Sequence, residues 1–310
     1  MNFKPETIIT TPSYYGITDS PAYIQLGGTV YCIHHGYENN HELWYTKSND
    51  LITWTADAQF VDVQTTFSPA AIVFNSIIYG FHNGSPNSSG DLNYVKVTGN
   101  SVTQDNPIHG LPEWKSSNSP SATVFNNLMY LAYHGPNNNG KLLLASSPDG
   151  VASNWSYKEV PGITITGSPS MATFNGKIYI VFRNTALGNG VYVTSTSDTN
   201  TWTTPTLIPN VQVSGDPKLT ATASKLVLVH RHPTNAKLHV VTCNNLGVWS
   251  ADQVVNTSDM FQDPGVGVFN GKVIVGLTIS TDAHMHLNNI VQRAKVIPSQ
   301  SPRDQEVLYQ

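Results

Sequence analysis

The sequence has little charge and little cysteine. Asp, Glu, Lys and Arg make up 12% of the chain, about half of the roughly 25% typical of a folded domain. With a net charge of -4 and a pI near 6.2, the chain lacks the clustered cations that neutralise phosphates, so we expect no nucleic-acid partner. The two cysteines, Cys32 and Cys243, exclude a disulfide framework and predict small, buried, unpaired side chains.

Long hydrophobic runs are also missing. No stretch of about 18 consecutive apolar residues occurs, so we expect no membrane insertion. The first six residues show no basic region followed by an apolar one, so no secretory signal is predicted. Localisation therefore stays open between the cytoplasm and release by a non-classical route. The 10 Phe, 6 Trp and 14 Tyr residues nevertheless predict a folded core rather than a disordered chain.

One motif recurs along the chain at a nearly constant interval. Each copy opens with Ser-Pro or Asp-Pro, and the six prolines are Pro21, Pro69, Pro120, Pro169, Pro217 and Pro264. The steps between them are 48, 51, 49, 48 and 47 residues. Proline is tolerated at the start of a strand, and pairs such as Asn175-Gly176 form tight hairpins. Because no segment combines helical periodicity with capping residues, each copy is predicted to form four short strands.

Four antiparallel strands in a repeat of 40 to 50 residues are typical of a β-propeller. The sequence therefore predicts an all-β, six-bladed β-propeller with four antiparallel strands per blade. We expect a single domain over residues 1–310, with repeats starting near residues 20, 68, 119, 168, 216 and 263. Residues 4–9 are expected to supply the outer strand of the last blade and close the ring, and residues 304–308 are the alternative.

The repeat resembles the blade of the bacterial β-propeller lectins first described from Photorhabdus. The similarity lies in the Ser-Pro and Phe-Asn-Gly-Lys-Ile-Tyr elements of residues 168–179, in an aromatic residue and His near a Gly, and in Leu43-Trp44-Tyr45. It spans roughly residues 18–275. Those lectins bind fucose and related sugars, so the resemblance implies multivalent, non-catalytic binding of neutral glycans. The lectins usually have seven blades, and this chain departs from them with six repeats.

Two segments resemble a second known element, the Asp box of sialidases. They are residues 48–54 and 196–202, each with an Asp followed by Thr-Trp. In sialidases the box is a structural turn away from the catalytic face. The resemblance therefore implies that these Asp residues stabilise turns.

Polar side chains cluster at one position of the repeat, 13 to 15 residues after the proline. Six of the eleven histidines and two of the four arginines lie there, at the end of the predicted second strand. Because that strand runs antiparallel to the first, its end lies at the same edge of the ring as the Ser or Asp that opens the repeat; we call this edge the rim. Loops at one edge of a rigid scaffold commonly carry binding residues.

His and Arg offer hydrogen bonds to sugar hydroxyls, and aromatic side chains of the third strands offer an apolar surface for the sugar ring. The predicted carbohydrate-binding residues are His34, His35, His82, His134, Arg183, His230, Arg231, Trp44, Tyr94 and Tyr192. The alternative is structural: each His is a strand-end residue bonded to backbone, and each aromatic belongs to the core between blades.

Catalysis is the main alternative function. Asp216 and Asp263 open adjacent repeats at equivalent positions, and Asp19 precedes the Ser of the first repeat. A pair of carboxylates is what hydrolysis of a glycosidic bond requires, so a sialidase-like or other glycoside hydrolase that uses rim carboxylates is the competing hypothesis. Of the arginines, only Arg183 and Arg231 fall at the rim, fewer than the triad of a sialidase.

Metal binding has weaker support from the sequence. His230-x-His232 and His284-x-His286 each place two imidazoles on one side of a strand. Neither pair has a nearby Cys or a clear carboxylate partner, so no metal site and no cofactor are predicted. We expect glycans as partners, and self-association stays open.

Overall fold

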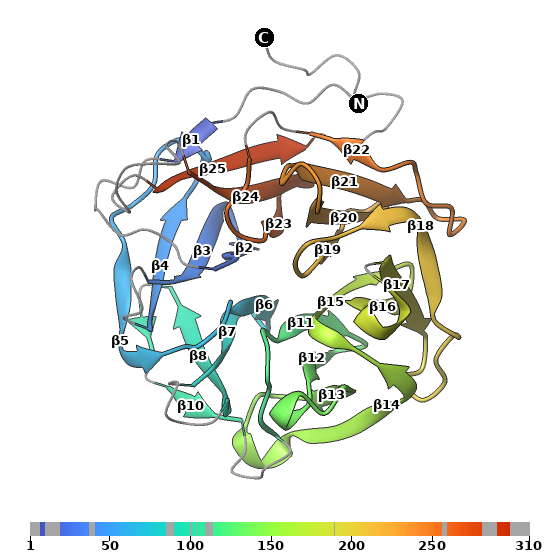
Figure 1. Ribbon diagram of the computed structural model, residues 1–310. Coiled ribbons are helices and arrows are strands. Elements are labelled where there is room, and N and C mark those ends of the chain that lie inside the picture. Colours follow the sequence, from blue (N-terminus) through green and yellow to red (C-terminus); the bar gives the residue numbers. More distant parts are fainter. Residues whose placement is uncertain are drawn as a thin grey trace.

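The computed structural model describes residues 7–9, 19–36, 41–84, 90–99, 101–103, 105–108, 114–188, 190–255, 259–280 and 290–297. Its antiparallel sheets stand around a central axis as the blades of a β-propeller (Figure 1). Short 3-10 helices lie in loops, among them η3 (Pro136–Asn138), η4 (Ala152–Asn154) and η5 (Thr185–Leu187). Within the described ranges, no helix has the length and apolar character needed to cross a bilayer.

Each sheet is built from strands that follow one another in sequence. The first repeat forms β2 (Ala22–Leu26), β3 (Thr29–His35), β4 (Glu42–Ser48) and β5 (Ala58–Gln64). The second forms β6 (Ala70–Phe74), β7 (Ile77–Asn83), β8 (Leu92–Thr98), β9 (Ser101–Val102) and β10 (Asn106–Pro107). The third forms β11 (Ser121–Phe125), β12 (Leu128–His134), β13 (Lys141–Ser147) and β14 (Ser156–Thr164).

The later repeats follow the same order. The fourth forms β15 (Thr166–Phe174), β16 (Lys177–Arg183), β17 (Gly190–Thr196) and β18 (Thr206–Gln212). The fifth forms β19 (Lys218–Ala221), β20 (Leu226–Arg231), β21 (Leu238–Cys243) and β22 (Gln253–Val254). The last repeat supplies β23 (Gly265–Phe269), β24 (Lys272–Ser280) and β25 (Ile290–Ile297), and the N-terminal β1 (Thr7–Ile9) completes its sheet.

The structure confirms a β-propeller but corrects the predicted blade composition: six blades of four strands each is wrong. Four-stranded antiparallel blades number five, and the sheet of the second repeat has five strands instead. The reason lies just after β8. Thr98 pairs with Ser101 across a turn in which Gly99 has a φ of 61°, so β9 folds back at once onto β8. The chain then returns, and β10 pairs with an earlier part of β8, at Asn93 and Tyr94.

The ring closes through the N-terminal segment, as predicted. Strand β1 pairs antiparallel with β25, with Ile8 opposite Arg293. The sheet therefore joins two segments that are far apart in the sequence (Figure 1). The alternative closing segment, residues 304–308, lies outside the described residues.

The core lies between neighbouring sheets. Second strands such as β3 and β12 are buried over almost their whole length, as their apolar sequences predict. Between the second and third sheets, Phe81 and Trp155 meet edge to face with ring centroids 5.7 Å apart. Both cysteines are buried and unpaired, which confirms the prediction for them.

An Asp side chain holds the turn between the third and fourth strands in several repeats. Oδ1 of Asp198 accepts hydrogen bonds from the backbone N–H groups of Asn200 (2.8 Å) and Thr201 (2.7 Å), and Asp50 does the same in the first repeat. Those backbone hydrogen bonds lower the pKa of Asp198 from 3.8 to about 2. Because the third strand runs away from the rim, these turns lie at the opposite edge of the ring.

Candidate functional site at the rim

The residue before each repeat proline belongs to a closed circle of hydrogen bonds between sheets. Each backbone N–H donates to the side chain of the equivalent residue one repeat further on: Ser20 to Ser68 (3.0 Å), Ser68 to Ser119 (3.1 Å), Ser119 to Ser168 (3.1 Å), Ser168 to Asp216 (3.0 Å) and Asp216 to Asp263 (2.7 Å). The hydroxyl of Ser20 then donates to the carbonyl oxygen of Asp263 (3.0 Å). The six residues, here called the Ser/Asp ring, tie every sheet to the next.

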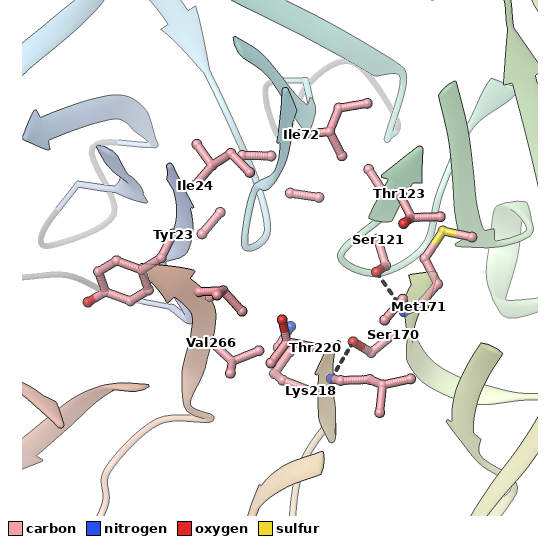
Figure 2. Close-up of a pocket in the computed structure, with 18 of the residues that line it drawn as sticks. Tyr23, Ile24, Ile72, Ser121, Thr123, Ser170, Met171, Lys218, Thr220 and Val266 are labelled. Atoms are coloured by element: carbon pink, nitrogen blue, oxygen red, sulfur yellow. Dashed lines mark hydrogen bonds between the residues drawn. The ribbon is translucent and has the colours of Figure 1, made fainter. Parts of the chain in front are cut away.

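The first strands of the sheets line a central cavity of about 460 Å³ (Figure 2). Its wall is mostly small, apolar or hydroxyl-bearing, with Ile24, Ile72, Thr123 and Thr220 among the side chains that face it. Lys218 is the charged residue among those that line it in the described part of the chain. Four of the six repeat prolines, Pro21, Pro69, Pro120 and Pro169, belong to the same lining, so the Ser/Asp ring lies at one end of this cavity.

Two neighbouring members of the Ser/Asp ring are carboxylates, and each has an arginine beside it. Oδ1 of Asp216 accepts hydrogen bonds from Nη2 (2.7 Å) and Nε (3.1 Å) of Arg183. Oδ1 of Asp263 lies 3.8 Å from Nε of Arg231, and neither of these two atoms has a hydrogen-bond partner among the described residues. All four side chains are partly exposed, between 17% and 26%. We call them the carboxylate pair and its two arginines.

Glycines make room for this carboxylate pair. A Cβ on Gly167 would collide with the Asp216 carboxylate and the Arg183 guanidinium, and one on Gly215 would collide with the Asp263 carboxylate. Repeats whose neighbour contributes only a serine carry Asp19, Phe67, Asn118 or Gln262 at the glycine position. The longer Asp side chain therefore requires glycine in the sheet before it.

The two carboxyl groups have different electrostatic environments. Burial raises the pKa of Asp263, against the opposing effects of the Asp216 N–H, Lys218 and Arg231. Asp216 has a two-point ion pair with Arg183 instead. One carboxyl is thus mostly desolvated, whereas the other is held by two hydrogen bonds from a guanidinium.

Three of the predicted histidines lie inside their own sheets. His34, His82 and His230 are at most 1% exposed. Their Nε2 atoms face the carboxylates of Asp57 (3.4 Å), Asp105 (3.0 Å) and Asp252 (3.2 Å), which stand just before or at the fourth strand. These histidine–aspartate pairs link the second strand to the outer edge of the same sheet.

The next residue along each second strand points to the other face, because side chains alternate along a strand. His35 faces Asp19 (Nδ1 to Oδ2, 3.2 Å), and His134 lies beside Asn118 (Nδ1 to Nδ2, 2.8 Å). Arg183 and Arg231 occupy this same position in the fourth and fifth repeats. Strand alternation therefore separates the predicted histidines and arginines into two sets, and the second set includes the two residues beside the Ser/Asp ring, Arg183 and Arg231.

The predicted aromatic residues are divided between core and partly exposed positions. Tyr94 is 4% exposed and packs against Tyr79 and Phe81. Tyr192 is half-buried and stacks on Phe182 with centroids 6.0 Å apart. Trp44 is half-buried and stands opposite His34 in the sheet register. Within the described part of the chain, none of the three lines the central cavity.

Sequence reasoning missed the partners of these residues. Asp57, Asp105 and Asp252 follow their histidines by 23, 23 and 22 residues, a spacing that recurs in three repeats and was detectable in the sequence. Gly167 and Gly215 were also missed. Each stands directly before a member of the Ser/Asp ring, and in both cases the following repeat opens with Asp-Pro. His284 and His286 lie outside the described residues.

Comparisons with known proteins identify the fold. The sequence matches no protein-family model and no curated protein sequence. A protein of unknown function from Dyadobacter fermentans is similar in structure, with a TM-score of 0.68, 13% identity, and coverage of 95% of this chain and 98% of that one. The NanB sialidase from Streptococcus pneumoniae has a TM-score of 0.68 and 11% identity, over 95% of this chain and 70% of that one.

An α-L-arabinofuranosidase from Clostridium thermocellum is also similar, with a TM-score of 0.53 and 13% identity, over 78% of this chain and 95% of that one. At such identities the likeness shows a shared fold. The protein is therefore a β-propeller whose structural neighbours include sialidase and glycoside hydrolase propellers.

Proposed function

We propose that this protein acts on carbohydrate as a glycoside hydrolase, with Asp216 and Asp263 as its carboxylates. The observation that carries this proposal is the difference in environment between two acidic side chains on adjacent sheets at one end of the central cavity. Glycoside hydrolysis uses such a pair, one carboxyl as the acid and the other as the base or nucleophile. The similarity of the fold to a sialidase and an arabinofuranosidase supports the same function.

Asp263 is assigned the role of general acid. Burial raises its pKa, as suits an acid, and its Oδ1 has no hydrogen-bond partner among the described residues. It gives its proton to the glycosidic oxygen as the bond from that oxygen to the anomeric carbon breaks. A proton from solvent then restores the acid.

Asp216 is assigned the second role. Its carboxylate is oriented by Arg183 and by the backbone N–H of Ser168. It faces the positive charge that develops on the sugar ring and accepts a proton from the water that supplies the new hydroxyl group at the anomeric carbon.

The same groups account for sugar binding. A ligand hydroxyl that reached these two buried atoms, Oδ1 of Asp263 and Nε of Arg231, would give a hydrogen bond to the first and accept one from the second. Satisfying two unpartnered polar atoms at once favours a polyhydroxylated ligand over an apolar one. Lys218 adds a further donor on the cavity wall.

Non-catalytic glycan binding is the second candidate. It is favoured by the recurrence of a histidine with a polar partner at the same strand end in different sheets, as in His35 with Asp19 and His134 with Asn118. Several weak sites around one ring would gain avidity on a multivalent glycan. This candidate keeps the lectin function that the sequence resemblance implies.

One experiment separates the two candidates. The wild type, Asp263→Asn and Asp216→Asn are assayed for turnover on a panel of aryl glycosides and for retention on a glycan array. We expect turnover by the wild type and a loss of about 10²- to 10⁴-fold in each variant, with Asp198→Asn, at the opposite edge, as the unchanged control. Glycan retention without any turnover would contradict the hydrolase and support the lectin.

A further inference from the structure

In the fifth sheet, the histidine–aspartate pair is enlarged by a second imidazole. His230 on β20 and His239 on β21 are opposite one another in the sheet register. Nε2 of His230 lies 3.2 Å from Oδ1 of Asp252, and Nδ1 of His239 lies 2.9 Å from Oδ2 of the same carboxylate. Within the described ranges, these three residues form the one group of His, Cys, Asp or Glu side chains whose ligand atoms could hold a metal ion, all within 4.8 Å of one another.

We propose that His230, His239 and Asp252 bind a divalent transition-metal ion of the zinc class. Neighbouring ligand atoms of a tetrahedral zinc ion, with bonds of about 2.0–2.1 Å, lie about 3.3 Å apart. The nitrogen-to-oxygen separations here are already close to that value. Two imidazoles and one carboxylate also form a recurrent three-residue ligand set for zinc, with the fourth position left to water or another ligand.

Burial and hydrogen bonding prepare the three side chains for this role. His230 is fully buried and His239 is 7% exposed, while the Asp252 side chain is 12% exposed. Nδ2 of Asn235 lies 3.2 Å from Nε2 of His239, so the Asn235 amide contacts the ring nitrogen that does not face Asp252. Nδ1 of His230 is buried without a partner, whereas the same atom of His82 lies 3.2 Å from the carbonyl oxygen of Asn83.

In two other sheets with a histidine–aspartate pair, the residue opposite the histidine is not a second histidine. At the position of His239, the first sheet has Trp44 opposite His34, and the second has Asn93 opposite His82. Only the fifth sheet adds an imidazole, and there His232 stacks on His239 with ring centroids 4.4 Å apart. The partly exposed His232 provides a further nitrogen donor beside the cluster.

The three residues come from separate parts of the fifth sheet: His230 lies on β20, His239 lies on β21 and Asp252 stands just before β22. A bound ion would join β20, β21 and the segment before β22 at the outer part of the sheet. The proposal is independent of the hydrolase, since neither Asp216 nor Asp263 belongs to the cluster.

Isothermal titration of the full, chelator-treated chain with zinc chloride tests the proposal. We expect one equivalent to bind to the wild type, and at least tenfold weaker binding in His239→Gln and in Asp252→Asn. Asp105→Asn is the matched control, because it alters the histidine–aspartate pair of the second sheet, which has no second imidazole. This variant should bind zinc as the wild type does. Wild-type binding that His239→Gln leaves unchanged, or no binding at all, would overturn the site.

A second measurement needs no variant. Cobalt(II) added to the chelator-treated wild type should give an X-ray absorption spectrum with imidazole nitrogens and a carboxylate among its ligands. A coordination shell of oxygen atoms alone would overturn the proposal even if the substituted chains failed to fold.

Discussion

The backbone N–H of Asp216 donates a 2.7 Å hydrogen bond to Oδ2 of Asp263, which stands 47 residues later at the equivalent place of the next repeat. In other parts of the Ser/Asp ring a serine hydroxyl accepts this bond. A carboxylate has a second oxygen, and here that atom faces Arg231 with no hydrogen-bond partner in the described part of the chain. Asp263 therefore joins two sheets through Oδ2 and is also the proposed acid.

The Ser/Asp ring should contribute measurably to stability. Ser119→Ala removes the acceptor of the buried Ser68 N–H, and an unsatisfied buried donor costs about 1–3 kcal/mol. We expect that decrease in the free energy of unfolding in urea. Ser153→Ala, at an exposed position, is the control and should stay within about 0.5 kcal/mol of the wild type. Equal effects of the two substitutions on the free energy of unfolding would contradict a stabilising role of the Ser/Asp ring.

A methyl group at position 215 should lower the stability of the protein. A Cβ there would overlap the Asp263 carboxylate, so Gly215→Ala should displace that side chain and destabilise the protein by about 1–3 kcal/mol. Gly28→Ala is the matched control, because nothing lies within 4 Å of its Cβ position and its φ is not positive. Thermal unfolding of both variants compares them, and a Gly215→Ala protein as stable as Gly28→Ala would contradict the assigned packing.

The turn at Asp198 predicts a pH dependence of stability. Its folded pKa is lowered from 3.8 to about 2, so the unfolded chain binds more protons between these values. The stabilisation is complete above pH 3.8 and is lost as the pH falls through about 2. The advantage of the wild type over Asp198→Asn in unfolding midpoint should therefore shrink between pH 6 and pH 2. A difference that stays constant over this range would contradict the assignment.

A second metal site should be obtainable by one substitution. Asn93 stands opposite His82 as His239 stands opposite His230, and Asp105 already faces His82. Asn93→His should therefore raise the zinc stoichiometry from one equivalent to two in the same titration. A stoichiometry that remains at one would argue against the cross-strand imidazole as the decisive ligand.

Much of the fold follows from local sequence patterns. The prolines and Asn-Gly turns mark strand starts and hairpins, because backbone conformation restricts those residues directly. The extra strand of the second sheet was not foreseen, since a turn at Gly99 divides the outer edge between two short strands. No hydrophobic pattern marks that change, because β9 and β10 have only two residues each.

The site was less predictable than the fold. His34 and His35 are adjacent in sequence yet face different partners, Asp57 and Asp19. Which face each one takes depends on the strand register, which a repeat of polar residues does not specify. The carboxylate of Asp252 lies in a segment without a strong strand pattern, so the cluster with His239 emerges only from the folded sheet.

The central claim, that Asp263 acts as the acid on a glycosidic bond, is tested most directly by the pH profile of kcat/KM on aryl glycosides for the wild type and Asp263→Asn. Because the acid must be protonated and burial raises its pKa, wild-type turnover should decline as the pH rises through that raised pKa. Asp263→Asn should lose turnover across the whole range, whereas Asp198→Asn should follow the wild type. A variant Asp263→Asn as active as the wild type, or a wild type without turnover on any glycoside of the panel, would contradict the account.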